Sequence, residues 1–133
     1  MLRTLDTNIC SYVLRRRPVA MLERFAGLNR QQVWLSGIVA AELRFGAVKL
    51  GVPRFSTAVE AWLAGFDVQA WPVQATDHYA RIRATLERAG TRIGAMDLLL
   101  AAHALANDSV LVTNNAKEFR RVPGLAVEEW SLE

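Results

Sequence analysis

Short apolar runs alternate with longer amphipathic segments along this 133-residue chain, and this alternation restricts the possible folds more than any other feature. The apolar runs predict strands at 2–5, 33–36, 68–71, 110–112 and 126–128. Helical periodicity predicts helices at 8–16, 19–28, 38–50, 56–63, 76–89 and 95–107, with Thr76 as the cap of the fifth. Strands that alternate with helices form a parallel sheet covered on both faces. We therefore predict a three-layer α/β fold with a sheet of four or five strands.

Length and composition indicate one ordinary globular domain spanning residues 1–133. A chain of this size buries enough surface to fold without disulfides or structural metals. Its content of 52% hydrophobic and 22% charged residues excludes a disordered or low-complexity protein. A single cysteine, Cys10, excludes an internal disulfide and a zinc site of several cysteines. With no signal-like or membrane-spanning stretch, we expect a soluble, cytoplasmic protein.

The basic residues are weakly informative about a partner. The net charge is +3, and arginine accounts for 14 of the 16 basic residues. Arginine suits phosphate recognition, although a GC-rich genome produces the same bias. The basic run at 15–17 is either an RNA contact or a solvated helix end. Four further basic residues near the acidic segments, which could guide phosphates inward, are Arg44, Lys49, Arg92 and Lys117.

Polar side chains follow the predicted strands, at the sheet edge where ligands bind in open parallel sheets. Asp6 follows the first strand and Glu42 lies in the helix after the second. Asp97 lies in the first turn of the apolar helix at 95–107, and Asn115, with Glu118 three residues later, follows the fourth strand. Each also has a simpler explanation, as a helix cap, a solvated helix residue or a partner of the helix dipole. Together they form a candidate acidic site.

Carboxylates that converge at one edge repel one another, and a bound cation relieves that repulsion. Ligand sets made only of oxygen atoms select hard ions, Mg²⁺ or Mn²⁺. Such an ion bound beside a phosphate is the setting for metal-assisted phosphodiester hydrolysis.

Several short motifs resemble PIN-domain ribonucleases of the VapC toxin type. The matching segments are LDTN at 5–8, AEL at 41–43, IGAMD at 93–97 leading into LAAHA at 100–104, VTNN at 112–115, and the tail with EF at 118–119, VPGL at 122–125 and Trp130. The resemblance covers nearly the whole chain, with the motifs in the expected order.

This resemblance implies a sheet of order 3-2-1-4-5 and Mg²⁺-dependent cleavage of tRNA, rRNA or mRNA. It implies that Asp6 and Asp97 hold the ion directly, while Glu42 binds it through water or orients the attacking water. Asn115 and Thr113 are expected to fix the geometry of these ligands. The fourth family position, usually aspartate, falls on Asn115, so the number of bound ions is open. Glu118 is an alternative fourth acid, because it lies three residues further along a possible short helix.

The resemblance also implies partners. We expect a cognate antitoxin that blocks the site, a homodimer, and a higher assembly of the two. The segment 19–63, which carries Leu50, Phe55 and Trp62, is the predicted antitoxin groove. Two other functions stay open: a catalytically weakened PIN-like RNA-binding module, suggested by Asn115, and an unrelated α/β phosphatase or phosphotransferase that uses Asp6.

Other chemically capable residues are predicted to be structural. His103 lies six residues after Asp97, which places the two side chains about 120° apart around a helix. We therefore expect a core histidine rather than a ligand. Cys10 is expected to be a buried structural thiol, and the four tryptophans to fill the core and interfaces.

Overall fold

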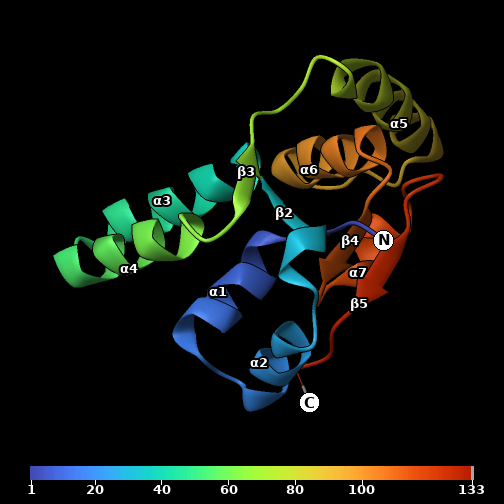
Figure 1. Cartoon of the computed structure of the whole chain (residues 1–133). Coiled ribbons are helices and arrows are strands. Elements are labelled where there is room, and N and C mark those ends of the chain that lie inside the picture. Colours follow the sequence, from blue (N-terminus) through green and yellow to red (C-terminus); the bar gives the residue numbers. More distant parts are fainter. Residues whose placement is uncertain (133) are drawn as a thin grey trace.

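All five predicted strands form one parallel sheet in the computed structural model, which describes residues 1–132. Residue 133, the last of the predicted domain, lies outside the described residues. The strands are β1 (Arg3–Leu5), β2 (Val33–Ser36), β3 (Asp67–Gln69), β4 (Val110–Thr113) and β5 (Val127–Glu129). Their order is β3-β2-β1-β4-β5, and every neighbouring pair is parallel (Figure 1). This confirms the 3-2-1-4-5 order.

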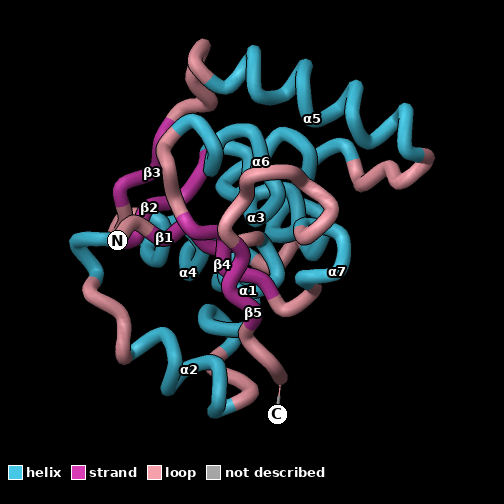
Figure 2. Tube along the Cα trace, turned by 90° about the vertical axis from the view of Figure 1, so that its right-hand side faces the viewer, coloured by secondary structure: helices cyan, strands magenta, loops and turns pink. Residues whose placement is uncertain are grey.

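Helices cover both faces of the sheet. They are α1 (Thr7–Arg15), α2 (Val19–Ala26), the 3₁₀ turn η1 (Arg30–Gln32), α3 (Gly37–Leu50), α4 (Pro53–Leu63), α5 (Ala75–Ala89), α6 (Ala95–Ala106) and α7 (Ala116–Phe119). Crossovers between parallel strands are right-handed, and the chain reverses direction across the sheet after β3. Accordingly, α1 and α2 lie on one side and α5 and α6 on the other (Figure 1). Figure 2 shows α5 outside α6, with α2 at the opposite end of the molecule.

Helices α3 and α4 pack side by side and project away from the sheet (Figure 1). Gly51 ends α3 with a φ of +72°, a left-handed conformation that glycine adopts without strain. Pro53 then occupies the first turn of α4, where no backbone N–H is needed. The helix predicted to start at Ser56 therefore starts at Pro53 and is one turn longer.

One predicted helix cap is wrong. Helix α5 begins at Ala75, with Gln74 in the cap position, so Thr76 already lies in the first turn. Its hydroxyl donates to the carbonyl of Val73 at 2.7 Å instead of accepting from the helix. Both edge strands also differ from their predicted bounds: β3 starts one residue earlier and ends two residues earlier than predicted, and β5 lies one residue further along the chain.

The core lies on both sides of the central strands. Leu5, Leu35 and Leu111 are fully buried on β1, β2 and β4. Cys10 and His103 are also fully buried, which confirms both as structural residues of the core. None of the helices within residues 1–132 combines the length and hydrophobicity needed to cross a membrane.

Hydrogen bonds connect the polar groups of this core. The indole of Trp34 donates to Ser109 Oγ at 3.0 Å. His103 Nδ1 lies 2.8 Å from Ser36 Oγ, and the same oxygen accepts from the N–H of Ile38 as the cap of α3. The His103–Ser36 contact thus joins α6 to the start of α3. The imidazole Nε2 has no partner within the described chain.

We expect His103 to make the protein sensitive to acid. Burial lowers the pKa of this imidazole from its usual 6.5 to about 4, so the folded protein keeps it neutral. As the pH is lowered, His103 binds a proton in the unfolded chain before it does so in the folded one. The free energy of unfolding therefore decreases as the pH is lowered from 6.5 to 4. At pH 5 the linkage amounts to about 2 kcal/mol. Urea unfolding at pH 7 and pH 5 should show a smaller acid loss for His103→Gln than for the native chain; an equal loss contradicts the assignment.

Candidate active site

Three predicted carboxylates line one small pocket at the carboxyl ends of the strands. Asp6 follows β1, Glu42 lies in the second turn of α3, and Asp97 lies in the first turn of α6. Together with Thr7 and Asn8 they enclose a volume of about 180 Å³. Residues separated by as many as 91 positions therefore line one pocket, as predicted from their places after the strands.

Asp6 has both a structural and a chemical role. One carboxylate oxygen accepts from the N–H of Ile9 at 2.9 Å and caps α1. The other accepts from the hydroxyl of Thr113 at 2.5 Å. Burial raises the pKa of this carboxyl, with a smaller contribution from Glu42, while the two hydrogen bonds oppose the shift. One carboxylate oxygen is thus bonded to α1 and the other to the end of β4, so the side chain is held rigidly.

Glu42 is half-buried at the pocket wall. Its Oε1 accepts from the hydroxyl of Thr7 at 2.7 Å, which ties α3 to the first turn of α1. The alternative of a freely solvated helix residue is therefore wrong. The other carboxylate oxygen accepts no hydrogen bond from residues 1–132 and is available to the pocket.

Asp97 is the most perturbed acid of the site. Its pKa is raised to about 7, first by burial, next by hydrogen bonding with and repulsion from Glu118, and then by the charges of Asp6 and Glu42. A side chain on Gly94 would place its Cβ 3.3 Å from Asp97 Oδ2, so glycine leaves room for this carboxylate. Four acids thus act on one another electrostatically.

Asn115 does not join them through its side chain. It is exposed at the start of α7 and does not line the pocket. Its backbone N–H donates to Thr113 Oγ1 at 3.0 Å, which supports Asp6 indirectly. Glu118 on α7 lies beside Asp97, close enough for its carboxylate to raise the pKa of Asp97. Of the two predicted candidates for the fourth position, Glu118 is therefore the one whose side chain lies beside Asp97.

The donor set suits a hard cation, although the side chains do not form a closed cage. Among residues 1–132, no three Asp, Glu, His or Cys side chains are grouped tightly enough to hold an ion between them. Asp6 and Glu42 already accept hydrogen bonds from Thr113 and Thr7. Mg²⁺ commonly binds one or two carboxylates and keeps several waters, so this open arrangement fits it better than a fully dehydrated site.

A larger groove adjoins the acidic pocket. It encloses about 410 Å³ between α1, α3 and α4 and shares Thr7, Asn8 and Glu42 with that pocket. Leu50 and Phe55, two residues of the predicted antitoxin groove, line it. The third predicted residue, Trp62, does not, because its ring packs against Phe25 and Phe66 at centroid distances of 6.4 and 4.5 Å.

Some of the basic residues near the acidic segments are already paired with an acid, and others line a groove or pocket. Arg44 makes two hydrogen bonds to Glu60, at 2.8 and 2.9 Å, so it does not serve as a free phosphate guide. Arg15 and Lys49 line the apolar groove. Arg92 lies on the other side of α6, in a separate pocket.

Two hydroxyls support the site. Thr113, predicted to fix ligand geometry, holds Asp6, and Thr7 holds Glu42. The role of Thr7 was missed by sequence reasoning, and its position directly after Asp6 was the only available signal.

Comparison with known proteins identifies the class that this fold and site define. The PIN-domain family model matches residues 3–125, so the chain belongs to the PIN-domain family. The chain is 39% identical to the tRNA(fMet)-specific endonuclease VapC of Shigella flexneri over 96% of either chain. It is 36% identical to ribonuclease VapC2 of Rickettsia felis over 98% of either chain. Within the PIN-domain proteins it is therefore a member of the VapC ribonucleases.

Solved structures agree with this assignment. The chain superposes on VapBC of Salmonella typhimurium, solved bound to DNA, with a TM-score of 0.89 at 39% identity, covering 98% of this chain and 99% of that one. VapBC2 of Rickettsia felis, bound to a promoter fragment, gives a TM-score of 0.86 at 36% identity, covering 98% of this chain and 100% of that one. The unrelated phosphatase alternative is thereby excluded.

Proposed function

We propose that this protein is the endoribonuclease toxin of a toxin–antitoxin pair and hydrolyses RNA phosphodiester bonds with Mg²⁺ or Mn²⁺. The observation that carries this is that Asp6, Glu42 and Asp97 line one pocket, with Glu118 beside Asp97. Burial, followed by hydrogen bonding with and repulsion from Glu118 and by the charges of Asp6 and Glu42, raises the pKa of Asp97 to about 7. Such a crowded, partly buried set of acids favours a bound counter-charge. The VapC relatives support RNA as the substrate.

The roles of the residues follow from their surroundings. Asp6 and Asp97 would hold the ion, and Glu118 would hold it or one of its waters. Glu42 has one oxygen that accepts no hydrogen bond from the described residues, so it would orient the attacking water and accept its proton. Thr7 and Thr113 hold the two carboxylates in place by hydrogen bonds of 2.7 and 2.5 Å. A bound divalent ion supplies water of lowered pKa and charge neutralisation at the phosphate.

The antitoxin is proposed to dock in the groove lined by Leu50 and Phe55. That groove and the acidic pocket share Thr7, Asn8 and Glu42. A segment bound there covers one wall of the acidic pocket and excludes RNA. Arg15 and Lys49 on the groove wall favour a segment that carries acidic as well as apolar side chains.

A cleavage assay tests the proposed activity. The purified chain is incubated with a tRNA(fMet) transcript, an unstructured RNA and a DNA of the same sequence, with EDTA or with Mg²⁺. We expect cuts in RNA alone, none with EDTA, and recovery when Mg²⁺ or Mn²⁺ is restored. Tight RNA binding without cleavage under every metal condition would instead support the weakened binding module.

A further inference from the structure

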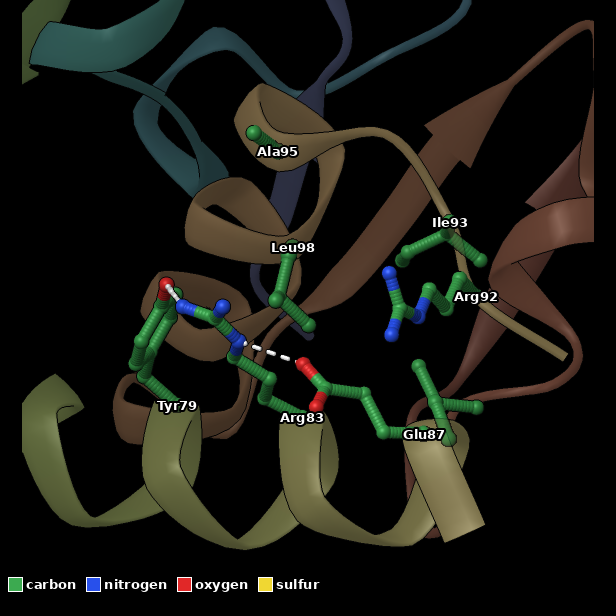
Figure 3. A pocket seen from close by; sticks show the side chains of 8 residues that line it. Tyr79, Arg83, Glu87, Arg92, Ile93, Ala95 and Leu98 are labelled. Atoms are coloured by element: carbon green, nitrogen blue, oxygen red, sulfur yellow. Dashed lines mark hydrogen bonds and ion pairs between the residues drawn. The ribbon is translucent and has the colours of Figure 1, made fainter. Parts of the chain in front are cut away.

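A second pocket lies on the far side of the start of α6. It encloses about 190 Å³ between α5, α6 and the loop that joins them (Figure 3). Its apolar walls come from Leu86, Ile93 and Leu98, of which Leu86 and Leu98 are buried members of the core. These walls are fixed by packing, so the pocket is part of the fold rather than a gap between mobile side chains.

The rim of this pocket is polar and contains one uncommitted cation. Arg83 donates to Glu87 at 2.7 Å and to the hydroxyl of Tyr79 at 2.8 Å, so its guanidinium is held in place. In Figure 3 the guanidinium of Arg92 extends over the opening, opposite that of Arg83. Within residues 1–132 the Arg92 side chain makes no hydrogen bond or ion pair. The pKa of Glu87 is lowered mainly by the hydrogen bond from Arg83, and the charge of Arg92 adds a smaller contribution.

This combination of groups matches the chemistry of a nucleotide. Apolar walls of small area accept a flat ring, and guanidinium and phenol groups at the rim stack on bases or bond to their edges. A free arginine at the opening binds phosphate through its planar fork of donors.

The position of the pocket links it to the acidic site. Ala95 and Leu98 line it, and Asp97, which lies between them in the chain, lines the acidic pocket. The two pockets are therefore separated by no more than one helix, about 10–12 Å across with its side chains. RNA approaching four carboxylates is repelled by them, so cations beside the site must hold the neighbouring phosphates.

We propose that this pocket binds one nucleotide of the RNA strand next to the scissile phosphate, with its base between Leu98 and Arg83 and its phosphate on Arg92. The proposal rests on the ribonuclease function proposed above. It adds a substrate subsite on the α5–α6 side that fixes where the strand lies relative to Asp97.

RNA binding by matched variants tests the phosphate contact. Fluorescence anisotropy with a labelled single-stranded RNA would be measured for Asp97→Asn alone, which is expected to bind without cutting, and for Asp97→Asn combined with Arg92→Ala or with Arg88→Ala. Arg88 is exposed on α5 and lies outside the pocket, so it controls for loss of one charge. We expect Arg92→Ala to weaken binding roughly five- to tenfold and to reduce the salt slope by about 0.7, with Arg88→Ala within about twofold.

Abasic substitutions test the base contact. Removing one base at a time from the RNA should weaken binding to the Asp97→Asn protein at a single position beside the cleavage site. That sensitivity to base removal should disappear in Arg92→Ala. Arg92→Lys should restore the salt dependence of binding but recover less of the sensitivity to base removal, because lysine lacks the planar group.

Equal effects of Arg92→Ala and Arg88→Ala, or no position sensitive to base removal, would overturn the subsite. A change of oligomeric state in Arg92→Ala, measured by light scattering, would assign the pocket to contact between copies of this chain and also overturn it. If the native chain neither binds nor cuts any RNA, the proposed function itself fails, which is a different result from these.

Discussion

Asp97→Asn is expected to lower RNA cleavage by about a thousandfold or more while leaving the fold intact. The substitution keeps the shape of the side chain and removes the charge that would hold the cation. It also removes the strongest electrostatic conflict of the site, since Asp97 faces Glu118, Asp6 and Glu42. Cleavage rates with saturating Mg²⁺ measure the effect, and retention of more than about a tenth of the activity contradicts the role of Asp97.

The same variant should be more stable than the native chain at pH 8. A folded-state pKa of about 7, against the usual 3.8, means that folding penalises the charged carboxylate once the pH exceeds 3.8. The penalty grows up to pH 7 and is then constant, so neutralising the residue gains about 1–2 kcal/mol at pH 8 after allowance for solvent screening. At pH 4 the two proteins should be equally stable.

Thermal unfolding with and without Mg²⁺ separates this effect from a general one. Mg²⁺ should raise the melting temperature of the native chain more than that of Asp97→Asn, because only the native site gains a bound counter-charge. Asp77→Asn is the matched control. Asp77 is exposed and pairs with Arg81 on the surface of α5, so this variant should keep both its activity and its Mg²⁺ response.

Glu118→Gln and Asn115→Ala should differ strongly in cleavage. Glu118 acts directly on Asp97, whereas Asn115 is exposed and contributes only its backbone N–H. We expect Glu118→Gln to reduce the rate about 10- to 100-fold, with a higher Mg²⁺ requirement, and Asn115→Ala to change it by less than about threefold. Initial rates across a Mg²⁺ titration provide the measurement.

If Asn115→Ala lowered the cleavage rate more than Glu118→Gln, Asn115 rather than Glu118 would be the fourth residue of the site. Circular dichroism of both variants would accompany the rates, since α7 is short and both residues belong to it or cap it. A loss of helical signal in Glu118→Gln would mean that its lower cleavage rate results from a folding defect. In that case Glu118→Asp, which keeps the charge, should not restore cleavage either. Recovery by that variant supports the direct role.

Local patterns were sufficient to predict most of the framework. Residues 33–35 form a continuous apolar run that ends at Ser36, and such a short run predicts a buried strand. The strand ends at Asp6 and Asn115 were likewise readable, because they lie where an apolar run stops. Errors occurred where two local signals competed, as at Thr76, whose hydroxyl bonds backwards to Val73 instead of capping α5.

The sequence by itself determined the alternation of strands and helices, the acids at the strand ends and the family motifs, because these depend on residues near one another in the chain. Only the tertiary structure decided that Glu118 rather than Asn115 faces Asp97, that Thr7 and Thr113 hold the carboxylates, and that Arg44 is already paired. Those outcomes depend on the direction in which each side chain leaves its own helix and on what a distant segment places opposite it. Spacing along the chain does not specify either of these.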